Sequence, residues 1–155
     1  MNQMEDMKMI IFECKGCGHI EFNEAPEKCK VCGALKSSFV ENPAVIQKPA
    51  NPAVLTEGDK KHIPQIVVVK ECGLIPGGCC TDVHVRVGEI EHVMTEKHLI
   101  RFIDFYLNHK FISRVWLSPD VCHPAAALHL NVTSGTLTAL ENCNLHGNWI
   151  SETAI

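Results

Sequence analysis

The chain of 155 residues is long enough for one domain of ordinary size and a small appendage. It carries a net charge of −4 and has neither a basic stripe nor a long apolar run, so we expect no nucleic acid and no membrane as partner. Its nine cysteines, an odd number without an apolar export signal before them, favour reduced thiols and metal sites in a cytoplasmic protein over a set of disulfides.

Residues 1–36 are predicted to form a small metal-binding domain, because two C-x-x-C pairs lie close together in this segment. The four cysteines are Cys14, Cys17, Cys29 and Cys32. Glycines beside each pair allow the backbone to turn its N–H groups toward the sulfurs. Four thiolates in this arrangement provide a tetrahedral site for zinc or iron. A structural zinc ribbon and a redox-active FeS4 centre both fit the pattern.

The residues around these pairs, 11–20 and 25–33, resemble the short rubredoxin-like domain of rubrerythrins. The resemblance implies iron and one-electron transfer, although zinc ribbons share much of the same pattern. His19 follows the first pair, and we expect it to be an exposed neighbour, since four sulfurs already complete the ligand set.

Residues 37–58 are predicted to form a semi-rigid linker. Pro43, Pro49 and Pro52 disfavour a continuous helix or a central strand in this segment. A spacer of this kind sets the distance between the domains on either side of it.

Residues 59–155 are predicted to form a second, β-rich domain. Apolar or alternating runs predict strands over 65–71, 81–87, 99–107, 110–117, 126–132 and 136–141. A short helix is the competing prediction for 99–107. Short strands at this spacing indicate a mainly β fold, an antiparallel sandwich of immunoglobulin type. The loops at one end of such a sandwich gather side chains that are distant in sequence.

Five potential metal ligands lie beside turns or strand ends of this domain: His62, His92, His98, Cys143 and His146. Cys143 and His146 form a C-x-x-H pair followed by Gly147, and such a pair can bind one metal from a tight turn. A chance grouping is the alternative, because nine histidines offer many combinations.

The motifs K-H-I-P, G-x-x-x-H-x-M-x-x-x-H-x-I and C-N-x-H-G-x-W occur in this order over residues 57–150 and resemble the superoxide reductase family (desulfoferrodoxin and neelaredoxin). The resemblance implies one iron held by four imidazoles and one thiolate, from His62, His92, His98, His146 and Cys143. It also implies reduction of superoxide to hydrogen peroxide with electrons from a rubredoxin-type donor. A homo-oligomer, either a dimer or a tetramer, is expected on the same ground.

Lys61 matches the family lysine that guides superoxide and helps to protonate the peroxide. Next to a metal ligand, Lys60 and Lys61 supply local positive charge in a negative chain, whereas a solvated charged turn is the alternative. Lys60 stands where many family members have a glutamate that occupies the sixth position of the oxidised iron. The neighbouring acids Glu57 and Asp59 are the candidates to replace that glutamate, and otherwise we expect an open position or bound water.

Electron donation by the Cys143 thiolate must be tempered if intact peroxide is to leave. We expect hydrogen bonds to this sulfur from the backbone N–H groups of Asn144 and Leu145.

Four further cysteines have no place in these two sites. Cys72, Cys79 and Cys80 surround a glycine-rich loop, where free thiols are expected and a third metal site or a redox thiol pair is the alternative. Cys122 is interpreted as a loop residue. His84 and His129 fall on the polar faces of alternating strands, and we expect them to be exposed.

Two other classes of function remain open at this point. A di-iron electron carrier or redox sensor would use the same sites without superoxide turnover and would react slowly with superoxide. A zinc ribbon joined to a β-sandwich binding module is the purely structural interpretation, but it leaves the five ligand positions without a reason.

Overall fold

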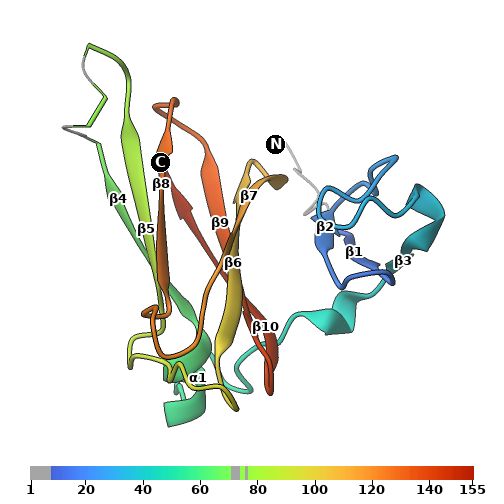
Figure 1. The fold of residues 1–155 in the computed structure, drawn as a ribbon, viewed down its shortest axis with the longest axis horizontal. Coiled ribbons are helices and arrows are strands. Elements are labelled where there is room, and N and C mark those ends of the chain that lie inside the picture. Colours follow the sequence, from blue (N-terminus) through green and yellow to red (C-terminus); the bar gives the residue numbers. More distant parts are fainter. Residues whose placement is uncertain (1–7, 71–73, 76) are drawn as a thin grey trace, which may run out of the picture. The chain divides into compact units, whose positions relative to one another are not determined.

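The computed structural model describes residues 8–70, 74, 75 and 77–155 (Figure 1). The chain divides into two compact units between Val45 and Ile46. Among the described residues, no helix is both long enough and apolar enough to cross a bilayer. Cys72 lies outside the described residues.

The first unit is a three-stranded antiparallel sheet with the strand order β2-β1-β3. Its elements are β1 (Ile11–Cys14), β2 (Ile20–Phe22), η1 (Lys36–Ser38), β3 (Phe39–Glu41) and η2 (Pro43–Val45). Phe39 is buried and packs against Cys14 and Cys29, which explains why β3 pairs with β1. The beginning of the segment predicted as a linker is therefore a strand of this unit.

The second unit is a sandwich of two antiparallel sheets, with the strand orders β10-β9-β6-β7 and β4-β5-β8 (Figure 1). Its elements are α1 (Glu57–His62), β4 (Pro64–Val69), β5 (Thr81–Val87), β6 (Ile100–Leu107), β7 (Lys110–Trp116), β8 (Ala125–Leu130), β9 (Thr136–Cys143) and β10 (Gly147–Ala154). The core lies between the sheets, where Val83 and Val85 of β5 meet Ile103 and Phe105 of β6. The prediction of a mainly β, antiparallel fold is confirmed.

The competing prediction of a helix over 99–107 is wrong, since this segment forms β6. Its residues pair with β9 on one side and β7 on the other, and this central position buries both faces of the strand. A strand buried on both faces has no alternating pattern, so it is easily mistaken for a buried helix.

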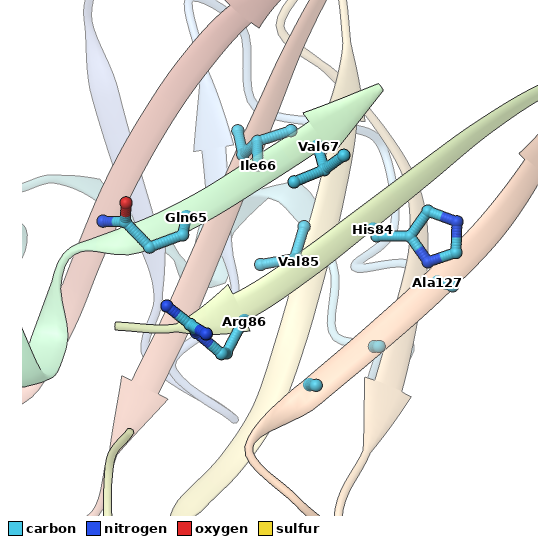
Figure 2. A pocket seen from close by; sticks show the side chains of 9 residues that line it. Gln65, Ile66, Val67, His84, Val85, Arg86 and Ala127 are labelled. Carbon is cyan, nitrogen blue, oxygen red and sulfur yellow. The ribbon is translucent and has the colours of Figure 1, made fainter. Parts of the chain in front are cut away.

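The outer face of the β4-β5-β8 sheet carries a broad hollow of about 600 Å³ (Figure 2). Gln65 and Val67 of β4, His84 and Arg86 of β5 and the alanines of β8 line it. His84 is exposed there, as predicted. None of the predicted metal ligands lines this hollow.

Candidate metal centres

The five side chains predicted as ligands in the second unit lie together at one end of the sandwich. His62 is the last residue of α1, and His92 and His98 lie between β5 and β6. Cys143 ends β9, and His146 lies in the turn that leads to β10. Since α1 precedes β4, all these segments meet at the lower end of the sandwich in Figure 1.

The four imidazoles form a closed ring. Neighbouring ring centroids lie 4.9 Å apart for His62 and His92, 4.6 Å for His92 and His98, 5.1 Å for His98 and His146, and 4.8 Å for His146 and His62. Neighbouring rings stand edge to face, with interplanar angles between 68° and 81°. The Cys143 sulfur lies 3.5 Å from Nδ1 of His146, and its distances to the ligand atoms of His62 and His98 are within 4.8 Å. The ligand atoms of His62, His98, His146 and Cys143 all lie within 4.8 Å of one another, and the ring of His92 packs against those of His62 and His98.

Hydrogen bonds on the far side of two rings fix which nitrogen faces the other ligands. Nδ1 of His62 lies 2.7 Å from the Gly58 carbonyl oxygen, and Nδ1 of His92 lies 2.6 Å from that of Val93. A carbonyl only accepts, so each Nδ1 carries the proton and donates it, which leaves a lone pair on Nε2.

The opposite nitrogens are left without partners. Nε2 of His62, His92 and His98 is buried and has no hydrogen-bond partner among the described residues. Buried polar atoms are normally satisfied, and a bound cation would satisfy these three clustered nitrogens. The residues present therefore fit a metal ion.

Burial lowers the pKa of all three of these imidazoles. The pKa of His92 falls to about 4, and neighbouring rings add to the effect at His62 and His98. At neutral pH the rings are therefore uncharged, which is the form that binds metals. Burial raises the pKa of the Cys143 thiol, so the sulfur keeps its proton until a cation displaces it.

The Cys143 sulfur accepts hydrogen bonds from the backbone N–H groups of Leu145 and His146. The prediction that the Leu145 N–H donates to this sulfur is therefore confirmed. The prediction for Asn144 is wrong, because its N–H donates to the Leu99 carbonyl at 3.1 Å. The tight turn points the second and third amides after the cysteine at the sulfur and turns the first one away.

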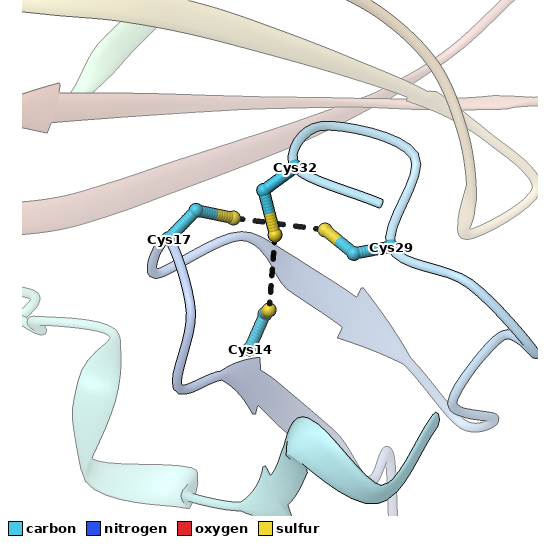
Figure 3. Close-up of side chains that lie close together, drawn as sticks. All are labelled: Cys14, Cys17, Cys29 and Cys32. Atoms are coloured by element: carbon cyan, nitrogen blue, oxygen red, sulfur yellow. Dashed lines mark hydrogen bonds between the residues drawn. The ribbon is translucent and has the colours of Figure 1, made fainter. Parts of the chain in front are cut away.

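The four cysteines of the first unit also converge (Figure 3). Cys14 and Cys32 sulfurs lie 3.7 Å apart, and Cys17 and Cys29 sulfurs lie 3.6 Å apart. A tetrahedral ion with metal–sulfur bonds of about 2.3 Å requires sulfur–sulfur distances of about 3.8 Å. The site fits one tetrahedral metal ion.

The same turn occurs three times in the chain. Gly18, Gly33 and Gly147 each follow the second ligand of a C-x-x-C or C-x-x-H pair, with φ of 80°, 78° and 79°. These angles lie in the left-handed region that favours glycine. In the turns before Gly33 and Gly147, backbone amides of the second and third residues after the first cysteine bond its sulfur. Local sequence therefore builds the same ligand turn in both units.

Lys61 lies beside the ring that the four imidazoles form. Its side chain is 40% exposed, its ammonium is 2.7 Å from a Glu57 carboxylate oxygen, and its charge contributes to the lowered pKa of His98. Asp59 instead accepts a hydrogen bond from the Thr56 N–H and caps α1. Both acids near Lys60 thus have partners of their own.

The predicted exposure of His19 is wrong. His19 is fully buried rather than exposed, because Nε2 of its ring lies 3.0 Å from a buried Glu21 carboxylate oxygen. Trp149 stacks on the His62 ring with centroids 5.3 Å apart.

Glu141 lies close to this site but was not among the predicted site residues. It shares the inner face of β9 with Ala139 and Cys143, is fully buried, and neither carboxyl oxygen has a partner among the described residues. Burial raises its pKa well above the ordinary value. The electrostatic interaction with Glu141 also contributes to the raised pKa of the Cys143 thiol. The sequence gives no local signal of this burial, because polar residues occur elsewhere in β9 as well, at Thr136, Thr138 and Asn142.

Replacing Glu141 with methionine is expected to raise the free energy of unfolding of the metal-free protein by about 1–2 kcal/mol. An apolar side chain of similar size removes the cost of burying unpaired oxygens. Urea unfolding measures the change, with Glu89→Met, an exposed position, as the control expected to be neutral. A less stable Glu141→Met protein would mean that the carboxyl group has a partner.

The chain is similar to proteins of known families. The desulfoferrodoxin family model matches residues 55–152, and that of the rubredoxin-like domain of rubrerythrin matches residues 12–40. The desulfoferrodoxin of Syntrophotalea carbinolica is 30% identical over 151 residues, which cover 94% of this chain and 97% of that protein. A protein of Methanocaldococcus jannaschii named putative superoxide reductase is 31% identical over 105 residues, covering 64% of this chain and 86% of that one.

Solved structures agree with these matches. The superoxide reductase (neelaredoxin) from Ignicoccus hospitalis superimposes with a TM-score of 0.51 and 29% identity, over 61% of this chain and 79% of that chain.

Proposed function

Because the chain belongs to the desulfoferrodoxin family and carries a rubredoxin-like segment, we propose that it is a superoxide reductase, which reduces superoxide by one electron to hydrogen peroxide. One observation carries the proposal, namely the closed ring of four imidazoles whose three buried Nε2 atoms lack partners and whose centre the Cys143 sulfur approaches.

We propose iron as the metal of this site. His62, His92 and His98 would bind through Nε2, His146 through Nδ1 and Cys143 through its sulfur. Imidazole and thiolate together suit a redox-active first-row ion, and ferrous iron would supply the electron. For the four-cysteine site we propose iron as well, reduced by a rubredoxin-type donor, with structural zinc as the alternative. A homo-oligomer is also proposed.

The protein holds the ligands in a fixed orientation and determines the side from which a small anion can reach the metal site. The carbonyls of Gly58 and Val93 lock two rings in one tautomer and orientation. His62, His92 and Cys143 are buried, whereas His146 is exposed and His98 is half-buried. A small anion would therefore approach on the side of the exposed rings, close to Lys61. Hydrogen bonds from Leu145 and His146 withdraw electron density from the sulfur.

Replacing Lys61 with alanine is expected to slow the second-order reaction with superoxide roughly tenfold at low ionic strength, because it removes a cation whose charge acts on the ligand His98 and can steer the anion. The difference should shrink as salt is added. Pulse radiolysis measures the rate. The exposed pair with Glu57 stabilises the fold little, so the variant should fold.

Lys60→Ala is the matched control, since it removes the same charge one residue earlier. An equal loss of rate in both variants would assign the effect to net charge and remove the specific role of Lys61.

The proposal is tested by counting iron in anaerobically purified protein and recording the visible spectrum before and after superoxide is added. Iron in the His/Cys site, with a thiolate-to-ferric band that appears as superoxide is consumed, is the expected result. No iron there, or iron that superoxide leaves reduced, would overturn it. A slow reaction with both irons present would instead favour an electron carrier or redox sensor.

A further inference from the structure

A third group of metal-binding side chains lies at the other end of the β4-β5-β8 sheet. Asp82 of β5 is the cross-strand partner of His129 of β8, and Cys80 lies two residues before Asp82. Because side chains two residues apart share a face of the sheet, the three side chains project from the same outer face. β5 runs from this group toward His92, so its length separates the two sites (Figure 1).

The three ligand atoms are close together. The Cys80 sulfur lies 3.5 Å from Nδ1 of His129 and 3.3 Å from Oδ1 of Asp82, and these two atoms lie 2.8 Å apart. In a tetrahedral zinc site with bonds of about 2.3 Å to sulfur and about 2.0 Å to nitrogen and oxygen, the sulfur edges are about 3.5 Å and the remaining edge about 3.3 Å. Both sulfur edges fit, and the shorter edge is the hydrogen bond that a cation would replace.

The contacts fit a metal site better than a catalytic triad. In a cysteine–histidine–aspartate triad, the thiol and the carboxylate bind opposite nitrogens of the ring, so that the ring relays a proton. Here both approach the same Nδ1 atom of His129. Three ligand atoms that converge on one side of a ring can fill three of the four positions of a tetrahedral metal site.

The group is open to an incoming ion. Cys80 is buried, but the side chains of His129 and Asp82 are 43% and 17% exposed. A cavity of about 330 Å³ borders Cys80 and His129 and is lined also by Cys79 and Asn131. The cavity leaves room for a water molecule as a further ligand.

We propose that Cys80, Asp82 and His129 bind one divalent zinc ion, with the remaining position facing the cavity. Thiolate and imidazole select zinc over magnesium or calcium, which prefer oxygen ligands alone. Binding releases the thiol proton to solvent and ties the start of β5 to β8. The site does not depend on the proposed reductase activity.

Zinc uptake by the iron-loaded protein tests this proposal. The protein is dialysed against buffered free Zn²⁺, and zinc and iron are counted together by mass spectrometry. The wild type should bind one zinc per chain more than Cys80→Ser, Asp82→Asn or His129→Ala, with iron unchanged in all. Zinc already present in the four-cysteine site cancels in this difference. X-ray absorption at the zinc edge should show one sulfur neighbour for the additional ion.

Cys122→Ser and His84→Gln are the matched controls, and both should keep the additional zinc. Asp82→Asn leaves the buried thiol in place, so it reports on the site even where Cys80→Ser disturbs packing. Equal zinc in the wild type and the three site variants would overturn the proposal, as would a gain of zinc matched by an equal loss of iron.

Discussion

Replacing Cys143 with serine is expected to abolish the thiolate-to-ferric band and to weaken iron binding at the His/Cys site at least about 100-fold. Loss of a mere hydrogen-bond partner of a ligand costs roughly 10–100-fold in affinity, and here a ligand itself is lost. Cys143 provides the sulfur of this set, and the amides of Leu145 and His146 already point at it. A serine hydroxyl at the same place stays protonated at neutral pH and is a poor replacement.

The measurement is iron per chain together with the visible spectrum of the oxidised protein. Cys122→Ser is the control thiol outside both sites, and Cys17→Ser should give the reverse pattern, with the four-cysteine site lost and the His/Cys band kept. A Cys143→Ser protein that keeps its band would assign the band to the first unit.

Gly88→Ala is expected to lower the free energy of unfolding by about 3 kcal/mol and to reduce the occupancy of the His/Cys site. A Cβ at this position would clash with the Lys60 carbonyl oxygen and would meet the Lys61 carbonyl carbon at 2.9 Å and the Ile63 carbonyl oxygen at 3.1 Å. Backbone atoms cannot move aside as a flexible side chain does, so the strain falls on α1. Because α1 ends at His62, the shift displaces this ligand relative to the others.

Urea unfolding of the metal-free and iron-loaded proteins measures both effects. Gly58→Ala is the matched control in the same helix, because the nearest atom to its Cβ is the Thr56 hydroxyl at 3.7 Å. Alanine favours a helix over glycine, so this control should gain about 0.5–1 kcal/mol. Equal stability of Gly88→Ala and the wild type would mean that α1 is free to shift.

Strands with a clear alternation were predictable from the sequence, and elements that depend on their partners were not. The valines of Thr81–Val87 alternate with polar residues, and β5 has these bounds. β10 is polar and partly exposed, and it forms because the turn before Gly147 folds it back onto β9. α1 has only six residues and no apolar stripe, and it depends on the capping box of Thr56 and Asp59.

In the metal site, too, one part was predictable from the sequence and another was not. The motifs marked the five residues that the structure brings together, but not which nitrogen of each ring faces the centre. That depends on the carbonyls of Gly58 and Val93, which any residue could provide. The burial of Glu141 and of His19 arises from strand pairing and packing, and neither has a local signature.

The uncharged state of the histidines gives the two centres opposite charge balance. Four thiolates outweigh the charge of any divalent or trivalent ion bound among them, whereas one thiolate and four neutral imidazoles leave such an ion with an excess of positive charge. With such an ion bound in each, the first centre would repel a small anion and the second would attract it, although the chain as a whole is negative. Even with the same metal in both, only one of them presents an electropositive surface to an anionic oxidant.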